Sequence, residues 1–247
     1  KPFFYTALKD IGTIKYRHEI FQDLEDNTLF ESLKSFSQKI GAMRQDLATI
    51  DKLHYRYHKE GWFLEAVNIY CEAVNGLAND LSSANLKSRG LQSLLKYLND
   101  YVMTDDFTSL LADTKRLKSA LTRVKYCILI KENIFKIQKY DNEIDYNPEV
   151  EETFDKFKQG AAKDYRVHFS AGAGMNHITA QILDFVARLY PDIFLDLDAY
   201  YKTHTDFLDE TIDVLDRELQ FYIAYLSHTA KFKRAGLPFC YPRISDD

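Results

Sequence analysis

The chain has 247 residues, of which 46% are hydrophobic and 28% charged, a balance that supports a packed core and excludes an intrinsically disordered polypeptide. Its net charge of −5 predicts no overall attraction to nucleic acid, and no apolar run reaches the roughly 18 residues that a membrane span needs. With only 9 glycines and 5 prolines, the chain has few turn residues, which predicts long helices.

The cysteines Cys71, Cys127 and Cys240 are far apart and odd in number. This usage favours reduced thiols in a cytoplasmic protein, with no disulfide framework, no metal site and no cofactor. The chain begins at Lys1-Pro2-Phe3, inside apolar sequence, without an initiator Met or the pattern of a signal peptide. We therefore expect a piece of a longer protein.

In chain order, the first predicted helix runs from Ile11 to Leu24. A heptad seam predicts a second helix, followed by an interruption at Gly61. The seam comprises Leu33, Phe36, Ile40, Met43, Leu47, Ile50, His54 and Tyr57. A third helix is indicated by Phe63, Val67, Tyr70, Val74, Leu77 and Leu81. After a polar loop at Ser82 to Gly90, helix resumes from Leu91 to about Leu121, with a break where Thr104 caps a new helix.

The period changes between Val124 and Asp141, where β-branched and aromatic residues alternate with polar ones. This pattern predicts a β-hairpin with Glu132-Asn133 as its two-residue loop. The register would pair Ile130 with Phe135, Ile128 with Ile137 and Tyr126 with Lys139. One face would then carry Ile128, Ile130, Phe135 and Ile137, and the other Lys125, Lys131, Lys136 and Gln138.

Basic residues concentrate in the same region. The stretch from Lys115 to Tyr140 has a local charge of +7, so the remainder of the chain carries −12. Lysines on such a hairpin would bind phosphates in a salt-sensitive and sequence-independent way. The candidate DNA-binding residues are Arg123, Lys125, Lys131, Lys136 and Lys139. The alternative is a solvated hairpin whose lysines only protect its edges from aggregation.

Beyond the hairpin, Pro148 to Gln159 predicts a short helix and Tyr165 to Phe169 a strand. A helix follows with a stripe of Ile178, Ile182, Phe185 and Leu189. From Pro191 to Gly236 neither Gly nor Pro intervenes, which predicts one returning helix of about 40 residues, about 60 Å long. Its apolar stripe would comprise Ile193, Leu197, Tyr200, His204, Leu208, Ile212, Leu215, Leu219, Tyr222 and Leu226.

These elements predict a mainly α fold: an elongated bundle of long helices with a small antiparallel β element in the middle. We expect three parts: residues 1–121 as helical core and outgoing lever, 122–176 as a small α/β clamp-like region with the basic hairpin, and 177–247 as long returning lever helices. The heptad seams are interpreted mainly as core within this arm, with contact to a second chain as the alternative.

Several runs are together similar to one known family. They are residues 149–157, Lys163 to Val167, Met175 to Ile178, Leu189-Tyr190-Pro191, Arg217 to Tyr222, and Ala235 to Pro242. Their order resembles the core, lever and clamp region of MutS-related DNA mismatch repair proteins, in a bacterial subgroup. The resemblance spans most of the chain and is clearest from about Val124 onward.

The resemblance implies a dimer that encircles DNA, whose lever helices connect a clamp to a C-terminal ATPase. That ATPase would follow Asp247. The chain contains no G-x-x-x-x-G-K-[ST] phosphate loop and no Phe-x-Glu mismatch wedge in a matching context. We therefore expect this chain to bind DNA without being an enzyme, and to relay conformational change from the ATPase.

Three further patterns contain residue types that can bind metals, bind nucleotides or transfer protons. His54 and His58, four residues apart, have the spacing of a metal pair, but no Glu accompanies them and a buried histidine is the favoured interpretation. Gly172-Ala173-Gly174 faintly resembles a G-x-G-x-x-G dinucleotide loop, but a flexible connector or a helix cap with Asn176 is the favoured interpretation. Asp192, Asp196 and Asp198 favour a solvated helix face over paired catalytic carboxylates.

Two other functions remain open. The first is a protein–protein interaction scaffold with no DNA role, in which the hairpin is only structural. The second is a helical metal enzyme that uses His54 and His58.

Overall fold

A computed structural model describes residues 8–131, 134–142 and 175–244. The described residues form eight helices and one antiparallel two-stranded sheet. In chain order they are α2 (Ile11–Asp23), α3 (Asn27–Ile50), α4 (Arg56–Ser83), α5 (Arg89–Val102), α6 (Asp105–Leu121), β1 (Tyr126–Lys131), β2 (Ile134–Lys139), α8 (His177–Leu189), α9 (Pro191–Thr203) and α10 (Glu210–Arg234). The predicted mainly α fold with a small β element is confirmed.

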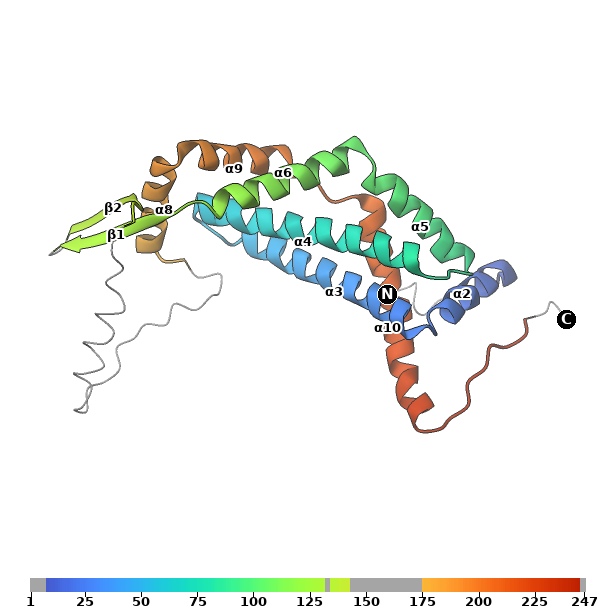
Figure 1. The fold of residues 1–247 in the computed structure, drawn as a ribbon. Helices are drawn as coiled ribbons and strands as arrows, with labels where there is room; N and C mark the ends of the chain where they lie inside the picture. Colours follow the sequence, from blue (N-terminus) through green and yellow to red (C-terminus); the bar gives the residue numbers. More distant parts are fainter. Residues whose placement is uncertain (1–7, 132–133, 143–174, 245–247) are drawn as a thin grey trace, which may run out of the picture.

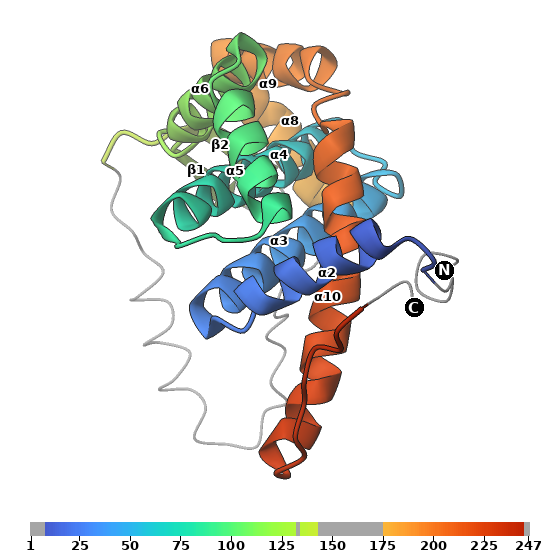
Figure 2. The same ribbon diagram turned by 90° about the vertical axis from the view of Figure 1, so that its right-hand side faces the viewer.

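Helix α4 is the centre of the bundle. It packs along α3 and also contacts α5, α6, α8 and α9. Figure 1 shows α3 and α4 side by side along the long axis, with the sheet at one end of the body. Helix α10 crosses α3 steeply and continues beyond the bundle, as the perpendicular view in Figure 2 shows.

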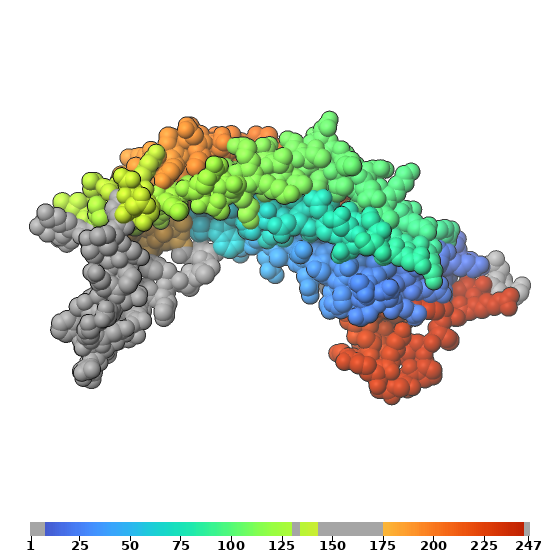
Figure 3. Space-filling model, viewed as in Figure 1, coloured from blue at the N-terminus to red at the C-terminus, as the bar shows by residue number. Residues whose placement is uncertain are grey.

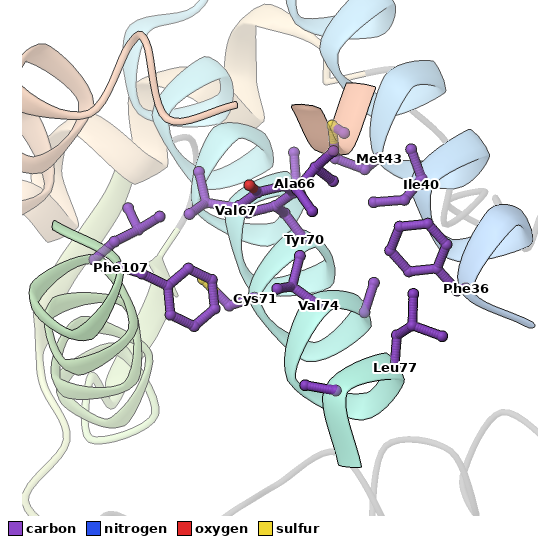
Figure 4. Packing of buried hydrophobic residues seen from close by; sticks show 14 of the residues in the cluster. Phe36, Ile40, Met43, Ala66, Val67, Tyr70, Cys71, Val74, Leu77 and Phe107 are labelled. Atoms are coloured by element: carbon purple, nitrogen blue, oxygen red, sulfur yellow. The ribbon is translucent and has the colours of Figure 1, made fainter. Parts of the chain in front are cut away.

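The core lies along the seams of α3 and α4 (Figure 4). The predicted stripe of α4, from Phe63 to Leu81, is buried at every position, and the seam of α3 is buried or packed on the core through Ile50. The largest fully buried side chain, Tyr70, keeps its hydroxyl paired because that group lies 2.8 Å from the hydroxyl of Tyr101. Burial raises the pKa of both hydroxyls, that of Tyr101 to about 12.

Side chains define most helix ends. Thr104 accepts from the backbone N–H of Phe107 and begins α6, which confirms the predicted cap. At the other end of the chain, α10 ends in a Schellman turn. There Gly236 has φ +84°, its N–H donates to the carbonyl of Lys233, and that of Leu237 donates to the carbonyl of Phe232. Gly236 takes this left-handed conformation without the steric cost that a Cβ would impose.

The predicted heptad seam was wrong after Ile50. The chain leaves α3 there and turns, so His54 is exposed in the connection and α4 begins at Arg56. The turn lets α4 pack back along α3, which buries both apolar stripes against each other. Gly61 does not interrupt α4, because a single helical glycine costs only about 1 kcal/mol.

The predicted returning helix of about 40 residues was also wrong. It is two helices, α9 and α10, separated by residues 204–209. Phe207 in this connection contacts the rings of Phe63 and Tyr70, and Asp209 caps α10 and accepts from the hydroxyl of Tyr97 at 2.7 Å. Tertiary contacts therefore break a segment that contains no Gly or Pro.

Helix α8 buries a different stripe from the predicted one. Of the predicted stripe, Ile182 packs against the core, whereas Ile178 and Phe185 are about half exposed. The residues that α8 buries fully are Ala180, Val186 and Ala187. The small side chains allow α8 to pack on α4, α9 and β2. Residues from α2 to α6 and from α8 to α10 contribute to one continuous hydrophobic cluster.

Candidate nucleic-acid interface

The hairpin projects from one end of the helical body, where Figures 1 and 3 show β1 and β2 at the tip. Its register is the predicted one, with Tyr126 opposite Lys139, Ile128 opposite Ile137 and Ile130 opposite Phe135. The predicted loop residues Glu132 and Asn133 lie outside the described residues, as do the helix predicted at 148–159, the strand at 165–169 and the glycines at 172–174.

Tyr190, at the junction of α8 and α9, holds the base of the hairpin. Its hydroxyl donates to the carbonyl of Lys125 at 2.5 Å and accepts from the N–H of the same residue at 3.4 Å. The ammonium of Lys139 lies 4.9 Å from the centre of the Tyr190 ring, a cation–π contact. Ile137 packs against the core below. The base of the hairpin is therefore joined to the helices on both strands.

The register places the five candidate cations on different surfaces. Lys125, Lys131 and Lys136 belong to one face, which we call the Lys125 face. The backbone of Lys131 is described but its side chain is not. Lys139 lies on the opposite face, which we call the Lys139 face. Arg123 precedes β1 and donates from Nε to the carbonyl of Ser119 at 3.4 Å, so it lies beside the hairpin.

Some of the local positive charge is neutralised by the helices. Arg116 pairs with Asp196 at 2.7 Å, and Lys118 pairs with Glu65 at 2.7 Å. In contrast, Lys125 and Lys136 are exposed, and neither forms an ion pair with an acid in the described part of the chain. Within this basic stretch, Lys125 and Lys136 therefore keep positive charge that is available to a polyanion.

Sequence reasoning missed how much apolar surface the hairpin exposes. Phe135 is 58% exposed and Ile134 is 69% exposed, and these two residues belong to opposite faces. Leu129, also on the Lys125 face, is 43% exposed. Positions 129 and 134 each lie two residues from a lysine of the same strand, Lys131 and Lys136. Side chains two residues apart share a face, so the sequence could have shown that Leu129 and Ile134 lie on the Lys125 face. The Lys125 face is thus mixed rather than purely polar.

The histidine pair is not assembled. His54 lies before α4 and is exposed, so the expectation of a buried histidine is wrong for it. His58 lies in the first turn of α4, accepts from the indole N–H of Trp62 at 3.0 Å, and has its pKa lowered by burial. Among the described residues, no three His, Cys, Asp or Glu side chains gather as metal ligands.

Two aspartates of α9 form ion pairs with helix side chains, whereas Asp192 is exposed. Asp196 pairs with Arg116, whereas Asp198 is mostly buried and binds Arg56 at 2.5 Å and Lys202 at 2.7 Å. The ion pair with Lys202 and that with Arg56 lower the pKa of Asp198. Arg56 also binds Glu60, whose other carboxylate oxygen has no hydrogen-bond partner among the described residues. Asp198 is therefore part of the contact between α4 and α9.

All three cysteines lie in described segments, and no disulfide joins any two of them. None of the helices in the described segments is both long and apolar enough to cross a bilayer. A comparison with protein-family models, with curated proteins and with solved structures finds no match to this chain.

Proposed function

We propose that this chain binds the phosphate backbone of DNA through its basic hairpin, as the lever and clamp module of a MutS-related protein in the cytoplasm. The observation that carries the proposal is the position of Lys125 and Lys136, exposed together on a hairpin that projects from one end of the body. The residues outside the stretch from Lys115 to Tyr140 carry a net charge of −12, so the hairpin end would attract a polyanion more than the rest of the chain as a whole.

The contacts at the hairpin base support a role in relaying motion. A displacement of α8 or α9 would reach the hairpin through Tyr190, which is bonded to the backbone of Lys125. The same displacement would reach α3 through α4, because α4 packs on α3, α8 and α9. Helix α10 joins this path at α3, where Asp216 binds Ser37. The relay thus consists of several packed helices in place of one 60 Å lever.

The test is fluorescence anisotropy of labelled DNA titrated with the full chain at 50 and 200 mM salt. If three to four lysines each release a counterion from duplex DNA, affinity should fall about 40- to 150-fold between these concentrations. Changing Lys125 and Lys136 to Glu should abolish binding at 200 mM salt. A matched control changes Lys39 and Lys96, exposed lysines on α3 and α5, to Glu.

The control matters because both double variants change the net charge by the same amount. Equal losses from both would mean that overall charge, and not the hairpin, determines binding. Absence of binding at 50 mM salt would refute the proposal that this chain binds DNA by itself.

A protein-interaction scaffold is the second candidate. It is favoured by the exposed apolar side chains at the hairpin end of the body, including Phe135 on β2 and Phe185 on α8. Such side chains are typical of protein interfaces. This function would predict that Lys125→Glu and Lys136→Glu leave partner binding intact while Phe135→Asp abolishes it.

A further inference from the structure

On each face of the hairpin, an exposed aromatic ring lies directly opposite a lysine. Tyr126 pairs with Lys139 on the Lys139 face. At the same level on the Lys125 face, Tyr140 donates its N–H to the carbonyl of Lys125 at 3.2 Å, which extends the ladder by one pair. Both tyrosines are more than 40% exposed. Cross-strand neighbours have Cβ atoms about 4.5–5.5 Å apart, so each ring and ammonium can contact one nucleotide together.

The Lys139 face carries a second exposed ring nearer the tip. Phe135 lies on this face together with Tyr126 and Ile128, and all three side chains are between 38% and 58% exposed. This arrangement offers two aromatic planes along one side of a thin projection. Ile128, located between them, keeps that side apolar.

This surface suits unpaired bases better than a duplex. The outside of a duplex presents phosphates and sugars, and burying Phe135 against them would gain little from the removal of its apolar area. Unpaired bases present flat π-faces that stack on aromatic rings without regard to sequence, while lysines beside the rings bind the connecting phosphates. The hairpin has both kinds of group within one short element.

We infer that the hairpin prefers single-stranded nucleic acid, with bases stacked on Tyr126 and Phe135 and the connecting phosphate bound by Lys139, the lysine of the same face. This inference rests on the proposed function and specifies its ligand. Lys139, fixed over the ring of Tyr190, is positioned to bind a phosphate next to the base on Tyr126. Figure 3 shows that the hairpin stands at the end of the body.

The experiment compares a labelled 20-residue oligothymidine, which has no duplex structure, with a labelled 20-base-pair duplex at 50 mM salt. The variants are Phe135→Leu and Tyr126→Leu in the full chain. Leucine keeps the apolar character and removes the aromatic plane, and neither ring belongs to the buried core. We expect each variant to weaken oligothymidine binding about fivefold or more and to leave duplex binding within about twofold.

Phe239→Leu is the matched control, because Phe239 is an exposed aromatic in the C-terminal segment after α10. It should leave both affinities unchanged. Circular dichroism spectra that match the parent chain would confirm that the hairpin variants remain folded.

Three outcomes separate this inference from the proposed function. Duplex binding at least as tight as single-strand binding, with both leucine variants unchanged, would overturn the single-strand inference and keep the lysine-based proposal. Absence of binding to either DNA would overturn both. Binding to vesicles that contain phosphatidylserine, with no binding to oligothymidine, would assign the exposed rings and lysines to a lipid surface and also overturn the inference.

Discussion

The buried carboxylate of Asp216 connects α10 to α3 and provides a direct test of this contact. Asp216 is 1% exposed, and both of its oxygens are bonded. One accepts from the hydroxyl of Ser37 at 2.5 Å, and the other pairs with the guanidinium of Arg44. Gln220 donates to the same Ser37 hydroxyl, and Arg44 also binds Asp213 at 2.8 Å. The Asp216→Ala change would remove the acceptor at the centre of this network.

Removing one partner of a fully buried ion pair costs about 3–5 kcal/mol. The cost here should be smaller, because the side chain of Arg44 is 35% exposed and keeps its bond to Asp213. We expect Asp216→Ala to lower the free energy of unfolding by about 2–3 kcal/mol. For a chain of this size, that corresponds to a fall in Tm of about 4–12 °C.

Thermal and urea unfolding followed by circular dichroism would measure this change. Ser37→Ala, which removes one neutral partner, should cost about 1 kcal/mol. The double variant Asp216→Leu with Arg44→Met replaces the pair by apolar groups and should recover most of the loss. If the unfolding free energy of Asp216→Ala lies within about 0.5 kcal/mol of that of the parent chain, the network does not hold α10 on α3 and the reasoning fails.

Three other predictions follow from the described contacts. A Cβ at Gly90 would lie 2.7 Å from a side-chain carbon of α2, so Gly90→Ala should lower the unfolding free energy by about 1–3 kcal/mol. A Cβ at Gly61 would meet nothing within 4 Å, so Gly61→Ala should raise the unfolding free energy by about 0.5–1 kcal/mol. Burial raises the pKa of Glu60 above its value in the unfolded chain, so ionisation of Glu60 lowers the stability of the folded protein as the pH rises from about 4. The Glu60→Gln variant does not ionise here, so its Tm minus that of the parent chain should increase between pH 4 and pH 7. An unchanged difference would refute that assignment. Tyr190→Phe removes the hydroxyl that holds the hairpin base, so amide hydrogen exchange in β1 and β2 should accelerate while exchange in α4 stays the same. Equal protection of β1 and β2 in the variant and the parent chain would contradict this prediction.

Local patterns in the sequence determined much of this protein. The stripe from Phe63 to Leu81 predicted the buried face of α4, because a period of 3.6 residues brings those side chains to one side. The hairpin register followed from a period of two, since any slip by one residue would exchange its faces. Thr104 marked the start of α6 because its hydroxyl can cap a helix. All three signals act over only a few residues.

The tertiary structure alone decided where the long seams end. Neither Gly nor Pro stops a helix at Ile50 or Thr203. Helix α4 turns back along α3, and Phe207 packs on Phe63 in the connection before Asp209, which caps α10. The tertiary structure also determined which basic residues form the candidate site. Arg116 and Lys118 pair with acidic residues of other helices, whereas Lys125 and Lys136 lie exposed on the hairpin. Charge along the sequence cannot show this, because pairing depends on which helices meet in space.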